Sequence, residues 1–350
     1  MPLVQACRSV ALLLLLLVLS ACDDGVSPGT PEGRVLGVVL NSVDISLTTF
    51  DAEDPGGSSP GTVGLAADGS PASMAVRGRW AAVPLGTVPA VAIVDLATLT
   101  LVRTVALPAG SGATGVAFIN DSIVVVANPA RNSVSPVNVR SGEAGPEVSV
   151  GGYPQAIVVS GDRVFAVNAE LGPDFLPAGP GTLTALDRET LAPEGTVTLS
   201  GVNPGSVAVG VGGRLHVVLS GSFGAGNGSL SVVDPGSLQE VAHHESFGEF
   251  PFAAAIGPSG RLHVASFGYG LAIWDPATET FVRTPDDAVT PEGIPSTSGL
   301  AFDPEGRLYT LRPECGEPGA AVRLSGTYDV ELTVPVGTCP LTIAFTTVED

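Results

Sequence analysis

Lysine is absent from the sequence, and each of the 15 basic residues is an arginine. Without lysine the chain cannot form a Schiff base with a carbonyl substrate, and it cannot supply the lysine of a phosphate-binding GxxxxGK(S/T) loop. The 35 acidic residues outnumber the arginines and give a formal net charge of −20. This balance argues against a nucleic-acid partner and against broad contact with anionic lipid.

Catalytic motifs are also missing. The sequence has no GxSxG nucleophile motif and no HExxH metal-binding motif, and it contains only four histidines. No catalytic residues and no cofactor are therefore predicted. What the chain does have is 44% hydrophobic residues, 45 glycines and 30 prolines. This combination supplies core material and dense turns, and it favours many short strands.

Cysteine is scarce, and its placement is informative. Cys7 and Cys22 flank the N-terminal apolar run, which leaves Cys315 and Cys339 as the pair in the rest of the chain. Outside the cytoplasm we expect these two residues to form a disulfide. Closing such a loop contributes about 3 kcal/mol in the chain-entropy model. A zinc site is the weaker alternative, because the pair has no CxxC spacing and no nearby histidine.

One long apolar run is present, VALLLLLLVLS at 10–20, and it follows Arg8. It has the length of a signal-peptide core and is too short to span a bilayer comfortably. The run ends in LSAC at 19–22, which resembles the lipobox of bacterial lipoproteins. The resemblance implies a signal peptide over 1–21 and, over 22–33, a lipidated Cys22 with a flexible tether. An ordinary signal peptide with an incidental cysteine is the alternative.

The lipobox resemblance also implies a location. Acyl chains on Cys22 would hold the protein to a membrane, since each buried methylene contributes roughly 0.8 kcal/mol. We therefore expect a protein of the bacterial cell envelope that is lipid-anchored and extracytoplasmic, facing the periplasm or the cell surface. Asp23 and Asp24 follow the cysteine and leave open which membrane holds the anchor.

A short apolar triplet, usually with a small central residue, recurs every 41 to 50 residues along the rest of the chain. Five of the seven copies have a proline three residues earlier. The copies are Met74–Val76, Val116–Phe118, Ile157–Val159, Val207–Val209, Ala254–Ile256, Leu300–Phe302 and Ile343–Phe345. A fixed period of this length indicates a repeat architecture.

Three further apolar runs, separated by turns, follow most triplets, as in RVFAVNA after Asp162, LTALDRET from 183 and PEGTVTLS after Ala192. Four short strand-like runs per repeat are typical of a propeller blade. The last triplet starts a repeat that is not completed, whereas the region from Arg34 supplies strands with no inner strand before them. We predict an all-β seven-bladed β-propeller over 34–350, with its ring closed by the C-terminal strand joining the N-terminal blade.

The runs VVVAN at 124–128 and VFAVN at 164–168, with third runs such as VAIVDLAT from 91, resemble the YVTN-type seven-bladed propellers. These are extracytoplasmic and surface β-propeller proteins. The resemblance covers nearly all of 34–350. It implies the propeller fold and, much less specifically, a role in binding. The last blade departs from the pattern, because Ser325 stands where other blades have aspartate and the two cysteines lie there.

The pentapeptide GRLHV occurs at 213–217 and at 260–264, and each copy carries a histidine. His216 and His263 occupy the same place in the second strand of successive blades, away from the axis. We expect two half-buried side chains that pack or hydrogen-bond between blades, rather than two ligands of one metal ion. His243 and His244 are neighbours in an outer strand, so alternation points them to opposite faces.

Polar residues end the third run of most blades and precede a turn. Such side chains accept hydrogen bonds from the backbone two residues on, so we predict turn residues rather than a general acid and base. They are Asp51, Asp95, Asn138, Asp187, Asp234 and Asp275.

Asn128 and Asn168 end second strands. In gluconolactonase-like propellers, Asn, Asp and Glu side chains near the axis hold a catalytic divalent cation. Here no set of three or four oxygen ligands recurs at axial positions, as such a cation requires. No metal site is predicted, and a divalent cation in the channel remains the alternative.

Long insertions offer the remaining indication of a ligand site. They lie at 170–181, 221–228 and 284–298, in the two classes of loop that share one face of a propeller. Binding residues concentrate on loops held by a rigid scaffold, although the same side chains can simply pack near the channel mouth. The candidate ligand contacts are Phe175, Phe223, Phe267, Tyr269, Asp286, Asp287 and Arg312.

These observations favour a membrane-anchored β-propeller lipoprotein that acts as a binding or scaffold module for a protein or an envelope carbohydrate. The alternative is a metal-dependent hydrolase or lactonase that uses the axial channel. A purely structural envelope protein is a third possibility.

Overall fold

The computed structural model describes residues 33–57, 59–293 and 295–349. The predicted signal peptide and Cys22 lie outside these residues, as does the predicted tether up to residue 32. Within the described part, no helix is long and apolar enough to span a membrane.

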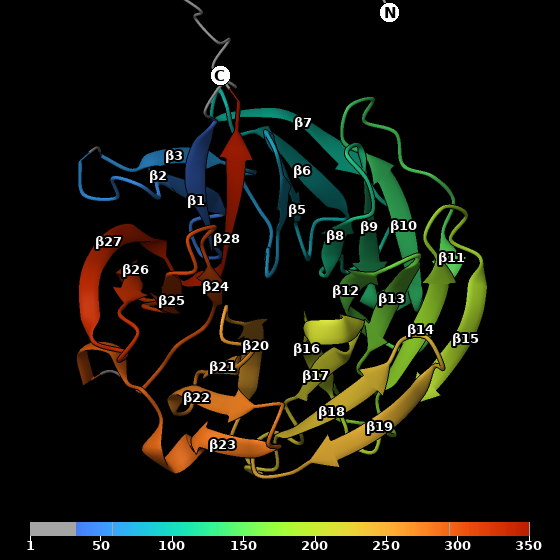
Figure 1. Ribbon diagram of the computed structural model, residues 1–350. Coiled ribbons are helices and arrows are strands. Elements are labelled where there is room, and N and C mark those ends of the chain that lie inside the picture. The colour runs from blue at the N-terminus through green and yellow to red at the C-terminus, as the bar shows by residue number, and fades with distance from the viewer. Residues whose placement is uncertain (1–32, 58, 294, 350) are drawn as a thin grey trace, which may run out of the picture. The chain divides into compact units, whose positions relative to one another are not determined.

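Seven four-stranded antiparallel sheets are arranged in a ring, as the sequence repeats predicted (Figure 1). Blade 1 contains β28 (Pro340–Val348), β1 (Arg34–Asn41), β2 (Ser46–Asp51) and β3 (Gly61–Gly64). Blade 2 contains β4 (Ala75–Arg77), β5 (Trp80–Pro84), β6 (Ala90–Asp95) and β7 (Thr100–Ala106). Blade 3 contains β8 (Val116–Phe118), β9 (Ile123–Asn128), β10 (Ser133–Asn138) and β11 (Val148–Ser149).

The remaining four blades follow the same order from the axis outward. Blade 4 contains β12 (Pro154–Ser160), β13 (Arg163–Asn168), β14 (Thr182–Asp187) and β15 (Pro193–Thr198). Blade 5 contains β16 (Pro204–Val209), β17 (Leu215–Leu219), β18 (Ser229–Asp234) and β19 (Gln239–His244). Blade 6 contains β20 (Pro251–Ile256), β21 (Leu262–Ser266), β22 (Gly270–Asp275) and β23 (Thr280–Arg283). Blade 7 contains β24 (Leu300–Phe302), β25 (Leu308–Arg312), β26 (Pro318–Leu324) and β27 (Val330–Thr338).

Among the described residues, four short 3-10 helices lie in the connections between strands. They are η1 (Pro129–Arg131), η2 (Val211–Gly213), η3 (Pro285–Asp287) and η4 (Pro291–Gly293).

The ring closes where the two ends of the described chain meet. β28 pairs antiparallel with β1, from Arg34 opposite Val348 to Asn41 opposite Pro340. It is the inner strand of blade 1, and it contacts β24 of blade 7 and β4 of blade 2. The predicted closure by the C-terminal strand is therefore confirmed.

The apolar core is divided among the contacts between neighbouring blades. One buried cluster combines Val91 and Ile93 of blade 2 with Val124 and Val126 of blade 3. The side chains of a middle strand point alternately to the two faces of its sheet, and a neighbouring sheet covers each face. This is why β6 and β22 are almost entirely buried. Burying a Val, Leu or Ile side chain contributes roughly 1.5–3 kcal/mol, so each blade is stabilised by the blades beside it.

Candidate functional site

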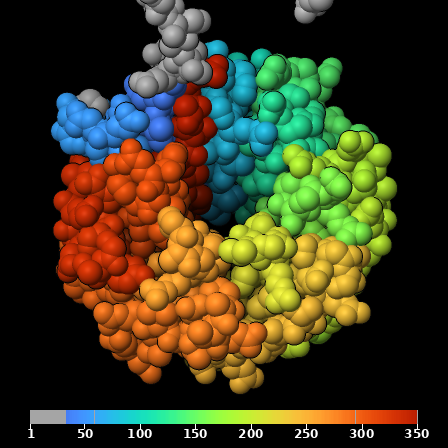
Figure 2. Space-filling view, viewed as in Figure 1, coloured from blue at the N-terminus to red at the C-terminus, as the bar shows by residue number. Residues whose placement is uncertain are grey.

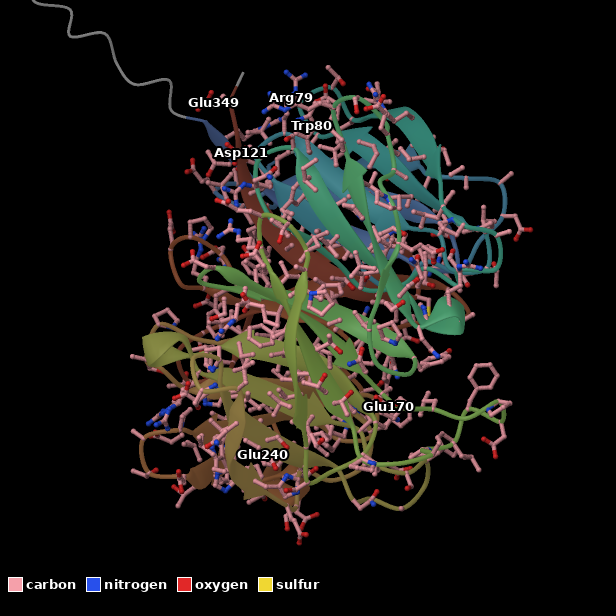
Figure 3. All side chains as sticks on the ribbon, turned by 90° about the vertical axis from the view of Figure 1, so that its right-hand side faces the viewer. Arg79, Trp80, Asp121, Glu170, Glu240 and Glu349 are labelled. Carbon is pink, nitrogen blue, oxygen red and sulfur yellow. A yellow bond between two sulfur atoms is a disulfide. The ribbon has the colours of Figure 1, made fainter. Side chains whose placement is uncertain are left out.

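The strand order gives the ring two different faces. The turn face carries the connections from first to second strands and from third to fourth strands. The elaborated face carries the second-to-third connections and the loops that join successive blades. Figure 3 shows Glu170 at the base of the long β13–β14 loop on the elaborated face, whereas Arg79, Trp80 and Asp121 lie toward the turn face.

On the turn face the predicted turn residues accept the expected backbone hydrogen bonds. Asp234 Oδ1 accepts from the N–H of Gly236 at 2.8 Å, and the other five turn residues accept from the N–H two positions on in the same way. Ser325 makes the equivalent bond through its hydroxyl, which accepts from Thr327 N–H at 3.2 Å. Backbone hydrogen bonds from Ser237 and Gly236 hold the pKa of Asp234 below its ordinary value. These carboxylates stabilise turns, as predicted.

On the elaborated face two phenylalanines stand out from the surface. Phe175, in the β13–β14 loop, is 66% exposed, and Phe223, in the β17–β18 loop, is 82% exposed. Each makes one edge-to-face aromatic contact, Phe175 with Tyr153 and Phe223 with Phe250, both with ring centroids 5.9 Å apart. Aromatic residues are enriched in protein interfaces relative to the rest of the surface, so these two side chains are candidates for ligand contact.

A row of aromatic rings leads from Phe223 toward the axis. Phe250 lies 6.5 Å from Phe267, and Phe267 lies 4.9 Å from Phe252, measured between ring centroids. Phe252 in turn lines the axial cavity. The structure therefore connects the predicted residues Phe223 and Phe267 through Phe250, and Phe252 continues the row to the cavity. The sequence analysis did not select Phe250 or Phe252.

Tyr153, Asn203, Phe250 and Cys339 share one structural position, directly before the proline that starts an inner strand. All four have left-handed backbone conformations, with φ between 52° and 56°. Such a φ is uncommon for residues other than glycine and is disfavoured before proline, so the neighbouring structure must hold it. The conformation turns the chain sharply from the elaborated face into an inner strand, so these four residues lie at the channel mouth, where the inner strands begin.

Three of the other predicted contact residues, Tyr269, Asp287 and Arg312, are buried or form ion pairs within the protein. Tyr269 is buried, and burial raises the pKa of its hydroxyl far above the ordinary value. Asp286 and Asp287 are exposed in η3, where Asp287 accepts from Arg283 at 2.8 Å. Arg312 forms an ion pair with Glu292. Tyr269 thus packs beneath the face rather than on it.

The predicted disulfide between Cys315 and Cys339 is present. It joins the β25–β26 loop to the start of β28, and Cys339 N–H also donates to the carbonyl of Glu314 at 2.6 Å. One of the four residues around the channel mouth is therefore covalently tied to blade 7.

The axial channel contains a cavity of about 340 Å³, and Figure 2 shows a hollow at the centre of the ring. All seven inner-strand regions contribute to its lining. The polar side chains among the lining residues are hydroxyls and one amide, those of Ser73, Thr114, Gln155, Ser206 and Thr342. No carboxylate or imidazole lines this cavity in the part of the chain that is described, so it offers none of the charged ligands that a tightly held divalent cation prefers.

Asn128 and Asn168 have a structural role that blade 1 shares. The Nδ2 group of Asn168 donates to the hydroxyls of Thr182 and Thr184, both at 3.0 Å, and Asn128 bonds a serine pair in the same way. Asn41 repeats the arrangement with Ser46 and Thr48. These buried amides tie second strands to third strands. The sequence analysis did not single out Asn41, although its position before the turn to β2 is the same.

His216 and His263 lie at equivalent positions of β17 and β21, opposite Ala208 and Ala255. They are 5% and 4% exposed, so the expectation of half-buried side chains is wrong: both side chains are almost fully buried. His263 Nε2 lies 3.1 Å from the hydroxyl of Tyr328 in blade 7, a hydrogen bond between blades as predicted. Burial lowers the pKa of His263 to about 4.

Within the described ranges, no three His, Cys, Asp or Glu side chains are grouped as a metal site requires. His243 Nδ1 lies 3.1 Å from Ser231 Oγ in its own blade. His244 packs against Trp274 of the next blade with ring centroids 4.8 Å apart. The two neighbouring imidazoles therefore point to opposite faces of β19, as the alternation predicted.

Comparison with known proteins supports the fold and nothing finer. No protein family matches the chain, and no curated protein matches it. Among solved structures, hydrazine synthase of Kuenenia stuttgartiensis is similar with a TM-score of 0.64 and 16% identity, over 79% of this chain and 90% of that one. Dihydro-heme d1 dehydrogenase NirN, solved in complex with DHE, is similar with a TM-score of 0.57 and 15% identity, over 90% of this chain and 75% of that one. At these identities the likeness establishes a shared β-propeller fold.

Proposed function

We propose that this protein is a lipid-anchored, extracytoplasmic β-propeller of the YVTN type that binds a protein or an envelope carbohydrate through its elaborated face. The observation that carries the proposal is the pair of exposed phenylalanines, Phe175 and Phe223, on the long β13–β14 and β17–β18 loops of the elaborated face. Exposed aromatic rings on a fixed scaffold lose little conformational entropy on binding.

The anchor supports a scaffold role. The lipobox-like LSAC sequence would place the propeller at a membrane surface through acyl chains on Cys22. The disulfide between Cys315 and Cys339 agrees with an oxidising compartment outside the cytoplasm. Binding at the elaborated face would then hold a partner close to that membrane.

The axial-channel hydrolase is less well supported. Its chemistry needs oxygen ligands of negative charge near the axis, whereas the lining side chains are uncharged. The two similar solved structures bear the names of enzymes, but their identities of 16% and 15% transfer no activity to this chain.

The test uses the full chain with Cys22→Ser, so that no lipid anchor retains it. This protein is expected to bind washed envelope fragments saturably, and Phe175→Ala/Phe223→Ala is expected to reduce the bound fraction at least tenfold. Val211 is 84% exposed on the turn face, so Val211→Ala is the matched control and should bind normally. Binding that is not saturable, or that the phenylalanine variants leave unchanged, would refute the proposal. Protease treatment of the fragments then distinguishes a protein partner from a carbohydrate.

A further inference from the structure

Arginine is distributed unequally between the two faces. The connecting loops of the turn face contain Arg79, Arg140, Arg188, Arg214, Arg261 and Arg307. Within the described residues, the connecting loops of the elaborated face contain Arg131 alone, whose Nε donates to Glu147 at 2.7 Å. Arg283 and Arg312, at strand ends beside that face, are likewise paired with Asp287 and Glu292. Every arginine that the described residues place on or beside the elaborated face is therefore paired with a carboxylate.

Several carboxylates on the elaborated face are not paired with a positively charged side chain among the described residues. Asp174, Glu245, Glu249 and Asp286 lie in its loops, and none of them forms an ion pair with any arginine or histidine in the described part of the chain. The chain as a whole carries −20, so distant charges do not neutralise this surface. A face of this kind repels anions and raises the local concentration of cations.

The carboxylates and the aromatic rings belong to the same loops. Asp174 directly precedes the exposed Phe175, and Glu249 directly precedes Phe250, the ring on which Phe223 packs. An aromatic face attracts a guanidinium or ammonium group, and an adjacent carboxylate strengthens the attraction through charge. Arginine and lysine also carry an apolar stem that packs on such rings.

We propose that the elaborated face binds a positively charged peptide segment of a partner protein, with arginine or lysine side chains alternating with apolar ones. This inference rests on the proposed function and narrows its partner to one chemistry. A neutral carbohydrate gains no charge–charge attraction from the uncompensated carboxylates, and an anionic one is repelled. Because the attraction is between exposed charges, binding weakens as salt screens them.

The probe is a fluorescent peptide of alternating arginine and leucine, titrated into the full chain carrying Cys22→Ser while anisotropy is recorded. A peptide with glutamate in place of arginine and the neutral sugar maltohexaose serve as comparison ligands. The arginine peptide is expected to bind, the glutamate peptide and the sugar are not, and affinity is expected to fall severalfold between 50 and 200 mM salt.

Two variants separate a specific face from general attraction by an acidic protein. Asp174→Asn/Glu249→Gln removes two charges at the elaborated face and is expected to weaken binding about tenfold. Glu53→Gln/Glu189→Gln removes the same charge from turn-face loops and is expected to change affinity less than twofold. Thermal melts of both double variants confirm folding. Equal losses in the two double variants would overturn the inference.

The outcomes also separate this inference from the proposed function. If maltohexaose binds and depends on Phe175 and Phe223 while the arginine peptide does not, the face binds a carbohydrate and only the present inference falls. If neither ligand binds but envelope binding still depends on the two phenylalanines, the inference is again wrong and the proposed function stands. If envelope binding is also unaffected by those variants, both fall.

Discussion

The two faces of the ring are built from the same strands but follow different rules. On the turn face, the same side-chain-to-backbone hydrogen bond recurs from Asp51 to Asp275. Ser325, which takes the place of the aspartate in blade 7, makes the same bond. On the elaborated face, equivalent positions hold Tyr153, Asn203, Phe250 and Cys339, four side chains with four different chemistries. Uniformity marks the positions that maintain the fold. Divergence on a shared backbone conformation marks positions whose side chains the fold does not dictate, as the disulfide at Cys339 and the aromatic contact at Phe250 show.

The largest effect should come from the element that belongs to neither face. Deleting 340–350 removes β28, the inner strand of blade 1, and leaves β1, β4 and β24 without their neighbour. We expect loss of cooperative folding or a fall of more than 15 °C in the melting temperature, measured by circular dichroism. Deleting only Glu349 and Asp350, which follow the strand, is the control and should leave the melt unchanged. A normal melt after the longer deletion would contradict closure of the ring by β28.

Removing the disulfide tests how much this covalent link on the elaborated face contributes to the free energy of unfolding. The bridge spans a sequence separation of 24 residues, and in the chain-entropy model a loop of this size contributes about 3 kcal/mol. Cys315→Ala/Cys339→Ala is therefore expected to lower the free energy of unfolding by about that amount in urea titrations. Adding a reductant to the unmodified protein should reproduce the loss. A loss in the variant with no effect of reductant on the unmodified protein would assign the effect to packing instead.

His263 tests the packing between blades that supports both faces. Burial holds its pKa at about 4 in the folded state, below the ordinary value of 6.5. Between about pH 6.5 and pH 4, His263 is protonated in the unfolded chain but stays neutral in the folded chain. The folded state therefore loses stability relative to the unfolded state as the pH falls through this range. The loss amounts to about 3 kcal/mol, and His263→Gln should remove this part of the pH dependence of unfolding.

A matched variant identifies the cause of the shift. Tyr328→Phe removes the hydroxyl partner of His263 but leaves the ring buried. Since burial is the main cause of the lowered pKa, this variant should keep the pH dependence. A flat profile in Tyr328→Phe would show that the hydrogen bond, rather than burial, controls the titration.

The smallest effects compare one residue from each face. Asp275→Ala removes a turn hydrogen bond at 2.9 Å and is expected to cost about 1 kcal/mol of stability without changing ligand binding. Phe223→Ala truncates a ring that is 82% exposed and is expected to change the free energy of unfolding by less than about 0.5 kcal/mol while weakening ligand binding. If Phe223→Ala destabilises the protein more than Asp275→Ala does, the phenylalanine belongs to the fold rather than to the binding surface.

The sequence predicts the scaffold well because the scaffold is repetitive. The triplet ending in Val159 and the aspartate at 187 recur with a regular period, and repetition makes a weak local signal reliable. The structure places them in the inner strand and at the end of the third strand of blade 4, as expected. The disulfide was predictable for a different reason, because Cys315 and Cys339 are the two cysteines within 34–350.

The candidate site was predicted only in part. Phe175 and Phe223 lie in long insertions, and the insertions are visible in the sequence. Phe250 and Phe252 lie around the first proline of an ordinary blade, so the sequence gives no sign that a left-handed residue turns one ring to the surface and the next one to the cavity. Tyr269 is buried beneath the face, which is the alternative placement that the sequence analysis left open for an aromatic residue near a loop.

The most direct test places a photo-crosslinking amino acid at 223 or at 211 in the full chain within intact cells. Both positions are more than four-fifths exposed, but they lie on opposite faces of the ring. Crosslinked products should form from position 223 and be absent, or at least tenfold fewer, from position 211. Equal products from both positions, or products from position 211 alone, would contradict the account of the elaborated face as the binding surface.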